Sequence, residues 1–311
     1  MVIILNPKAG AGQALRKWRR IQQSILQQFP KSELFVLNGK VSLDEFIRRK
    51  ITQGHRRFIA AGGDGTVHWL LQELGDRFDV HTRQQLEIGA IGLGSSNDFH
   101  KPFEARRFLK NVPVKMDFTS AAWQDVGELT FEDEAGNRQR RYWINNASMG
   151  ITAEANAFFN SPDALLNALK KHATPLAILY AALHTIFSYQ NKTMQIRFAQ
   201  ESPKSISVTN LGVVKNPHFS GNFCYDSPFE TDSGFFYVHL CYGMSRLQTL
   251  KTLRRLAGTQ FSGFPQTMVF RLNDLKVCAT EPFTVEYDGE TVQTRRAQFS
   301  VKKQWIRVCQ K

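Results

Sequence analysis

The segment Gly62-Gly63-Asp64-Gly65-Thr66 carries the residue types in this chain that are best suited to chemistry. It stands between the apolar run 58–61 and a helical pattern that continues to Leu74, which predicts a strand, a glycine turn and a helix start. We expect the glycines to take positive φ and, lacking a Cβ, to let a ligand touch the main chain. Thr66 is predicted to cap the helix, whose unpaired N–H groups and positive dipole end would attract phosphate. An ordinary tight turn is the alternative interpretation.

Asp64 is the residue that a phosphate site alone does not explain. A carboxylate repels phosphate unless a divalent cation lies between them, so Asp64 predicts Mg²⁺. A plain turn residue is an equally open interpretation of Asp64. The chain contains neither a G-x-x-x-x-G-K-[ST] loop nor a G-x-G-x-x-G motif. We therefore expect several turns to hold a nucleotide together.

Two further turns follow apolar runs in the same part of the chain. Residues 6–12 follow the run 2–5, and residues 92–98 follow the run 86–91. Strands that alternate with helices predict an α/β domain with a parallel sheet and helices on both faces. Because the carboxyl ends of parallel strands share one edge of a sheet, we expect all three turns along that edge.

Helix signals in this first part are clear at two places. Apolar residues repeat at helical spacing from Leu15 to Phe29. The segment 42–45, Ser-Leu-Asp-Glu, has the form of a capping box, which predicts a helix to about Thr52 with Gly54 just beyond it.

After about Lys115 the pattern changes to short segments rich in β-formers and separated by turn residues. This predicts a second domain, a β-sandwich built mainly from antiparallel strands. The strands are expected at 125–131, 141–147, 193–198, 205–214, 235–241, 267–272 and 284–287. One helix is predicted within 162–188, and another at 246–257, capped by Ser245 and ended by Gly258.

Length and charge narrow the classes of function. A chain of 311 residues suggests about two domains. The net charge of +13 indicates anionic partners, namely nucleic acid, nucleotide phosphates or an anionic membrane surface. No basic arm or zinc-finger spacing is present, so no nucleic acid is expected. The four cysteines are widely spaced and favour reduced thiols over disulfides or a zinc site.

The apolar segments bear on location. The start of the chain, MVIILNPK, lacks the features of a signal peptide, so a cytoplasmic protein is expected. The longest apolar stretch, 175–187, is shorter than the roughly 20 residues that span a bilayer. Any membrane contact should therefore be peripheral, at the inner face. Oligomeric state is not readable from the sequence, and a homodimer stays open.

Three motifs taken together resemble a known family. They are Asn6-Pro7-Lys8-Ala9-Gly10, Gly62-Gly63-Asp64-Gly65-Thr66 and Gly94-Ser95-Ser96-Asn97-Asp98-Phe99. In this order and at these distances they resemble the diacylglycerol kinase catalytic-domain family, which includes soluble bacterial lipid kinases and the sphingosine and ceramide kinases. Met116-Asp117-Phe118, 145–150, 220–236 and Tyr287-Asp288-Gly289-Glu290 also stand where bacterial members carry corresponding motifs.

The resemblance implies an architecture. It places a nucleotide-binding α/β catalytic domain at 1–118, joined by the C-terminal segment 297–311. A β-sandwich domain for the lipid substrate follows at 119–296, with the active site between the two domains.

The resemblance also implies the nucleotide site. Ser95 stands where the family usually has threonine, and Asn38 replaces another threonine on the nucleotide side. The residues implied to bind ATP are Asn6, Pro7, Lys8, Ala9, Gly10, Asn38, Gly62, Gly63, Asp64, Gly65, Thr66, Val67, His68, Ser95 and Asn97.

Acidic residues are implied around Mg²⁺. Asp64, Asp98 and Asp117 resemble those that build a network of Mg²⁺ and water under the phosphates. A second, structural Mg²⁺ is held in bacterial members by the aspartate of a D-G-x-L element. Here Asp232 lies one residue early and Ser233 takes the place of that aspartate, which puts the second site in doubt.

The D-G-E motif is implied to supply the general base. Attack of a lipid hydroxyl on the γ-phosphate needs a carboxylate within hydrogen-bond reach. On a regular strand, Asp288 and Glu290 would face the same side, and which of them takes the proton is open. The alternative is that Y-D-G-E is only a hairpin turn that joins Val285 to Val292.

The sequence therefore predicts an ATP- and Mg²⁺-dependent lipid kinase that acts on a lipid at the membrane surface. Diacylglycerol is the leading substrate, and sphingoid bases, phosphatidylglycerol and polyprenols stay open. A NAD kinase, which shares the GGDGT turn, is one alternative, and a catalytically silent nucleotide- or membrane-binding module is another. Apolar residues within 176–187 could line an acyl pocket or be plain core. A basic and aromatic patch, or a solvated helix face, is predicted at Lys251, Arg254, Arg255, Phe261 and Phe264.

Overall fold

The computed structural model describes residues 1–38, 42–75, 77–103 and 107–311. The chain divides into two compact units. The first unit contains Met1–Asp125 and Gln304–Lys311, and the second contains Val126–Lys303. The domain limits predicted from the sequence, at 118 and 297, stay a prediction.

A parallel sheet forms the centre of the first unit. Its strands, in spatial order, are β2 (Glu33–Val36), β1 (Val2–Leu5), β3 (Arg57–Gly62) and β4 (Glu87–Gly92). The end of β17 (Glu290–Cys309) pairs in parallel with the start of β4 through Arg307 and Val308. Two short strands complete the sheet: β6 (Val112–Lys115) runs antiparallel to the end of β4, and β5 (Arg107–Leu109) pairs with β6.

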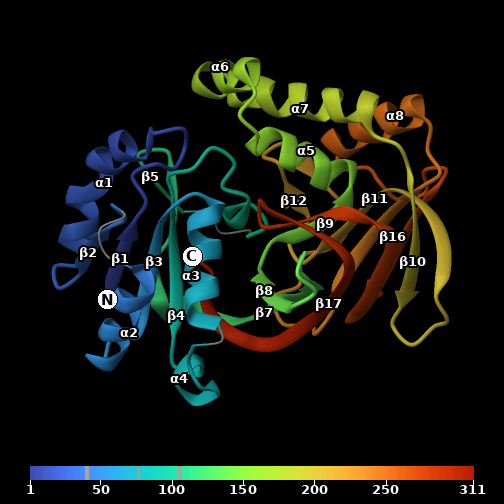
Figure 1. Cartoon of the computed structure of the whole chain (residues 1–311). Helices are drawn as coiled ribbons and strands as arrows, with labels where there is room; N and C mark the ends of the chain where they lie inside the picture. The colour runs from blue at the N-terminus through green and yellow to red at the C-terminus, as the bar shows by residue number, and fades with distance from the viewer. Residues whose placement is uncertain (39–41, 76, 104–106) are drawn as a thin grey trace. The chain divides into compact units, whose positions relative to one another are not determined.

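Helices cover both faces of this sheet. Those of the first unit are α1 (Ala14–Gln28), α2 (Leu43–Thr52), α3 (Asp64–Gly75), α4 (Val80–Gln84) and the 3-10 turns η1 (Asp98–His100) and η2 (Phe118–Ser120). Trp18 and Ile21 of α1 pack against Ile3 and its neighbours on one face. The alternate residues Ile4 and Ala60 are also buried, and α3 packs against β3 (Figure 1). After the charged residues Arg57 and Glu87 that begin β3 and β4, these two strands contain only apolar residues and glycine, as a sheet covered on both faces requires.

Three local expectations in this unit were wrong. Helix α3 begins at Asp64, so Thr66 lies inside its first turn and does not cap it. Gly62, Gly63 and Gly65 have no positive φ, and another reason for their presence is given below. Ser42 stands at the N-cap of α2, but its side chain makes no capping hydrogen bond.

The second unit is rich in antiparallel strands. The strand order is β15-β14-β11-β10-β16-β17, with β9 paired to both β11 and β16, and with β7 paired to β17 and β8. The pairings described among β9, β10, β11, β14, β15, β16 and β17 are antiparallel. The bounds of its strands are β7 (Ala121–Glu132), β8 (Arg138–Trp143), β9 (Asn146–Gly150), β10 (Lys192–Phe198), β11 (Lys204–Val214), β12 (His218–Phe219), β13 (Phe223–Cys224), β14 (Phe236–Tyr242), β15 (Thr267–Leu272) and β16 (Asp274–Tyr287).

One face of these strands forms the main core of the unit. Trp143, Leu211, Val238 and Phe283 are among its fully buried members. The antiparallel, β-rich character predicted from the sequence is confirmed by the pairing, and the sandwich arrangement stays a prediction. The strand predicted at 141–147 is divided, because β8 ends at Trp143 and β9 begins at Asn146.

Four helices belong to the second unit, namely α5 (Ile151–Asn160), α6 (Ala164–His172), α7 (Thr174–Ser188) and α8 (Arg246–Ala257). Helix α5 packs on β9, β11 and β16, and α7 contacts the other three helices (Figure 1). The single helix predicted within 162–188 is two helices, because Asp163 caps α6 and Pro175 starts α7. The cap at Ser245 is confirmed as a full capping box with Gln248. None of the described helices is long and apolar enough to cross a membrane.

Candidate active site

The three turns predicted at the carboxyl edge of the sheet lie against one another in the first unit. The Asn6 N–H donates to the Ala61 carbonyl at 2.9 Å, and the Leu93 N–H donates to the Gly62 carbonyl at 2.7 Å. The Asn6 side-chain amide donates to the Thr66 hydroxyl at 3.1 Å. We call segments 6–12, 62–66 and 92–98 together the loop cluster.

Close packing explains most of the glycines of the loop cluster. A Cβ on Gly94 would stand 2.5 Å from the Gly63 Cα, and one on Gly10 would stand 2.6 Å from the Leu93 carbonyl oxygen. A Cβ on Gly62 would overlap the Thr66 side chain. By contrast, a Cβ on Gly65 would meet nothing within 4 Å. The main chain is therefore exposed to a ligand at Gly65, in the first turn of α3.

Polar side chains also join the loops. One carboxylate oxygen of Asp64 accepts the Phe99 N–H at 2.9 Å. The Asn97 side chain accepts the Gly94 N–H at 3.0 Å and donates back to the Gly94 carbonyl at 3.2 Å. These contacts hold the loops, and they support a structural part for Asp64 and Asn97 beside the ligand roles predicted for them.

Two lysines that the motifs did not indicate brace the loop cluster. Lys17 Nζ donates to the Leu93 and Gly94 carbonyls at 3.2 and 2.8 Å, and burial lowers the pKa of Lys17. Lys115 Nζ donates to the Phe99 carbonyl at 3.1 Å, and burial places the pKa of Lys115 well below its usual value. Lys17 sits within a basic run of α1, so its sequence context predicts only a solvated helix face.

The remaining predicted nucleotide residues fall into exposed and buried sets. Lys8, Asn38 and Ser95 are exposed, whereas Pro7 and Ala9 are half-buried. Val67 and His68 are each only 3% exposed. The Val67 and His68 side chains are therefore in the interior and are not accessible to a ligand.

The acidic residues predicted to surround Mg²⁺ do not form one cluster. Asp98 pairs with Lys101 at 2.5 Å. Asp117 accepts the N–H and hydroxyl of Thr119, and the hydroxyl contact is the largest cause that lowers the pKa of Asp117. Since Lys115 pairs with Ala90, Asp117 continues toward the start of β4, away from the loop-bearing edge. Asp232 is exposed in the second unit.

No group of three or more metal-binding side chains gathers among the residues that the structure describes. Mg²⁺ at a nucleotide is usually bound by one or two carboxylates together with phosphate oxygens and water. Asp64, which lies within the loop cluster, is of a residue type that fits that donor set, and its metal role is a prediction as well. The metal roles of Asp98, Asp117 and Asp232 stay predictions.

In the second unit, the D-G-E motif is a two-residue hairpin turn. Tyr287 pairs with Glu290, and Val285 pairs with Val292. Asp288 and Gly289 have φ of +47° and +95°, as a tight turn with both central residues left-handed requires. The expectation of a regular strand here was wrong, because the backbone makes a hairpin turn, and the catalytic role of the motif stays a prediction. Consequently Asp288 and Glu290 do not alternate as strand neighbours would.

The two carboxylates of this turn differ in their surroundings. Asp288 is 8% exposed, and its oxygens accept the N–H groups of Ile144, Asn145 and Asn146 at 2.8, 2.9 and 3.3 Å. Those bonds explain why β8 and β9 are separated. Glu290 is exposed. The structure therefore gives Asp288 a holding part and leaves the Glu290 side chain accessible.

Glu286, two residues before Asp288, was not indicated by the motifs. Its side chain is buried, and burial raises the pKa of Glu286 to about 7. The Ser148 hydroxyl donates to one carboxyl oxygen at 2.7 Å, and the Gly289 N–H donates to the other at 2.8 Å. The signal for Glu286 in the sequence was a charged residue within a strand segment whose alternate residues are apolar.

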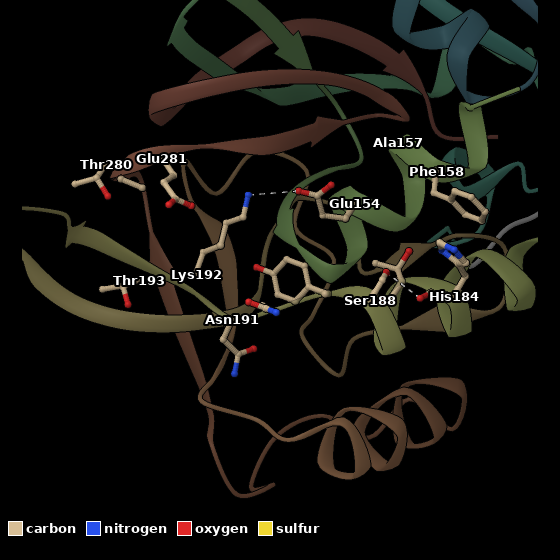
Figure 2. A pocket seen from close by; sticks show the side chains of 14 residues that line it. Glu154, Ala157, Phe158, His184, Ser188, Asn191, Lys192, Thr193, Thr280 and Glu281 are labelled. Carbon is tan, nitrogen blue, oxygen red and sulfur yellow. Dashed lines mark hydrogen bonds and ion pairs between the residues drawn. The ribbon is translucent and has the colours of Figure 1, made fainter. Parts of the chain in front are cut away.

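A polar hollow of about 670 Å³ opens elsewhere in the second unit, between α5, the end of α7 and the start of β10. Figure 2 shows Lys192 reaching toward Glu154, with His184 and Ser188 on another side. Lys192 Nζ also donates to the Pro282 carbonyl at 2.9 Å. This lining does not suit an acyl chain.

The apolar residues of α7 that could line an acyl pocket or be plain core differ in exposure. Ile186 is buried, whereas Leu176, Leu179 and Phe187 are exposed and Ile178 and Leu183 are half-buried. None of these six side chains lines the polar hollow.

Comparison with known proteins identifies the first part of the chain. Residues 1–121, which contain the loop cluster, match the model of the diacylglycerol kinase catalytic domain. This segment resembles the diacylglycerol kinase catalytic-domain family. The candidate lipid kinase YtlR of Bacillus subtilis is 26% identical over 159 residues, which are 49% of this chain and 48% of YtlR. The match to this curated relative thus spans about half of its length.

Solved structures share the fold over nearly the whole chain. A candidate diacylglycerol kinase from Bacillus anthracis superposes with a TM-score of 0.70 at 16% identity, covering 99% of this chain and 94% of that one. Yeast NADH kinase gives a TM-score of 0.52 at 10% identity, covering 99% and 81%. At such identities the likeness concerns the fold alone: an N-terminal α/β domain followed by an antiparallel, β-rich domain.

Proposed function

We propose that this protein is an ATP- and Mg²⁺-dependent lipid kinase that transfers the γ-phosphate to a lipid hydroxyl, with diacylglycerol as the leading acceptor. The observation that carries the proposal is the loop cluster. The three loops lie in the segment that matches the diacylglycerol kinase catalytic domain. They pack closely against one another and leave the main chain accessible at Gly65. Exposed N–H groups at a helix start suit phosphate oxygens.

In this proposal the loop cluster binds the ATP phosphates through main-chain groups at 6–10 and 62–66. Lys8 and Ser95 are exposed beside them and can contact phosphate. Mg²⁺, when bound, neutralises charge on the phosphate oxygens, and Asp64 is the carboxylate suited to hold it. Lys17 and Lys115 hold the loops through hydrogen bonds to their main-chain carbonyl groups.

Glu290 is the proposed proton acceptor. A general base needs an accessible carboxylate that can reach the attacking hydroxyl, and Glu290 is exposed. Asp288 already accepts three main-chain N–H groups, which suits it to hold the turn. In the D-G-E motif, Asp288 thus holds the turn and Glu290 accepts the proton.

The acceptor is proposed to be reached by peripheral contact with a membrane. Leu165, Leu176, Leu179 and Phe187 are exposed on α6 and α7. Basic residues on α8, Lys251 and Arg254, are exposed as well and would favour an anionic surface.

Of the two aromatic residues predicted for the basic and aromatic patch, Phe261 is wrong because it is buried. Phe261 is 1% exposed and belongs to a buried cluster. Phe264 lies under the Arg255 guanidinium, 5.0 Å from it.

The fold likeness to yeast NADH kinase keeps a nicotinamide nucleotide kinase as the second candidate. The experiment that decides is incubation of the purified protein with radiolabelled ATP and Mg²⁺, once with a total lipid extract and once with NAD. A labelled lipid that disappears in Glu290→Gln supports the proposal. Labelled NADP would support the second candidate, and no transfer to either acceptor would favour a catalytically silent binding module.

A further inference from the structure

The Glu286 carboxyl group is buried on the face of β16 opposite the main core, beside the D-G-E turn. We propose that Glu286 is a positioning residue, which sets the place of the Glu290 carboxylate by holding the peptide between Asp288 and Gly289. This inference rests on the proposed role of Glu290 in phosphoryl transfer.

Two of the three peptides of the turn are held by side chains. The Gly289 N–H donates to Glu286 Oε1 at 2.8 Å, which fixes the peptide that precedes Gly289. The Gly289 carbonyl accepts the Asn160 side-chain amide at 3.2 Å, which fixes the peptide that precedes Glu290. Because Gly289 has a φ of +95° and no side chain, its own conformation restrains the turn weakly. These two bonds add to the restraint from the Asp288 carboxylate and from the pairing of Tyr287 with Glu290.

The sheet register places Glu286 away from water. Glu286 on β16 pairs with Ser148 on β9, and Ser148 pairs with Gly212 on β11. The alternate residue Val285 points into the main core, so Glu286 and Ser148 face the other side. Helix α5 packs on these same strands and covers that side. A buried carboxyl group costs free energy, so packing alone would favour an apolar residue here.

Neighbouring groups shift the pKa of Glu286 in both directions, and burial, which raises it, is the largest cause. Asp288 in the turn raises the pKa of Glu286, while Ser148 and the Gly289 N–H lower it. On α5, Glu154 accepts the Thr284 hydroxyl on the same face of β16. Across the sheet, the charge of Glu286 helps to raise the pKa of Tyr225. Near neutral pH both forms of Glu286 are therefore present.

The charged form accepts the stronger hydrogen bond from Gly289 and holds the turn better. We expect kcat to rise with pH through about 7, the pKa of Glu286, and then to level off. Removing the Ser148 hydroxyl removes a bond that lowers this pKa, so the rise should move to higher pH. Misplacement of a catalytic group by about 1 Å can cost about 100-fold in rate.

The kinetic test uses full-length protein, radiolabelled ATP and dioleoylglycerol in mixed micelles between pH 5.5 and 9. Glu286→Gln keeps the shape and should lower kcat about 10-fold at pH 8, since a neutral acceptor holds the turn less well. The rise near pH 7 should vanish, with the KM for ATP unchanged. Ser148→Ala should shift the rise upward. Glu281→Gln, an exposed carboxylate on the same strand, is the matched control and should match the parent protein.

Two outcomes separate this inference from the proposed function. Full activity in Glu290→Gln would remove the proposed role of D-G-E. Loss of activity in Glu290→Gln together with a parental rate and pH profile in Glu286→Gln would overturn the positioning role alone.

Amide hydrogen exchange tests the holding contact without any substrate. Protection of the Gly289 N–H should fall in Glu286→Ala and stay unchanged in Glu281→Ala. Unchanged protection in Glu286→Ala would also overturn the inference.

Discussion

The loop cluster of the first unit and the D-G-E turn of the second unit both place glycine beside aspartate, yet they are built in opposite ways. In the loop cluster, glycines bring main chains close together, with Gly63 and Gly94 in direct contact. In the D-G-E turn, carboxylates hold the main chain, with Asp288 accepting three N–H groups. In the proposed function, the first construction provides N–H groups for an anion, and the second provides one exposed carboxylate, Glu290, for a hydroxyl.

The largest effect on stability is expected at Asp288. In Asp288→Asn an amide nitrogen replaces an oxygen that accepts a main-chain N–H, and the charge is lost. Hydrogen bonds to charged groups are worth about 1.5–3 kcal/mol each, so we expect a loss of about 4 kcal/mol. Denaturant unfolding measures it, and Glu290→Gln, at the exposed position, should be nearly neutral. Equal stabilities of Asp288→Asn and Glu290→Gln would contradict the different roles assigned to the two carboxylates.

Glu286 should make stability depend on pH. Its folded pKa of about 7 lies above the ordinary value of 4.5, so the folded state binds a proton more tightly. The stability that it contributes is full below pH 4.5 and is lost as the pH rises through 7. The free energy of unfolding of Glu286→Gln, relative to that of the parent protein, should therefore increase by about 2.5 kcal/mol from pH 5 to pH 8. Unfolding curves of both proteins at the two pH values decide, and a constant difference would contradict the shift.

Gly94 and Gly65 test the loop cluster as a pair. Gly94→Ala forces a Cβ against the Gly63 main chain and should cost about 2 kcal/mol of stability. Gly65→Ala meets open space inside a helix and should stabilise by up to about 1 kcal/mol. Thermal unfolding and ATP binding are measured for both variants. If Gly65→Ala binds ATP as well as the parent protein does, Gly65 does not face the phosphates.

Thr66 offers the smallest change. Thr66→Val keeps the side-chain shape but removes the acceptor for the Asn6 amide, a bond of about 1 kcal/mol. The free energy of unfolding should fall by the same amount in the presence and in the absence of nucleotide. A much larger effect on ATP affinity would instead give the Thr66 hydroxyl a direct contact with the nucleotide.

Local sequence patterns predicted what depends on neighbouring residues. Apolar runs located β1, β3 and β4, because strands covered on both faces are apolar over most of their length. Ser245 located the start of α8, because a capping box is read within four residues. The start of α3 was misjudged, since Thr66 bonds to Asn6, which lies 60 residues away.

The sequence by itself determined which turns carry chemistry and the family that their order resembles. The tertiary structure decided which carboxylates are engaged: Asp64 bonds to a main-chain N–H 35 residues away, and Asp288 to one 144 residues away. It also brought Glu286 to the D-G-E turn and buried it under α5. Turn and strand signals are local, so the residue types that suit the chemistry could be predicted from the sequence. Hydrogen-bond partners and burial come from distant segments. The separate roles of the carboxylates therefore could not be predicted.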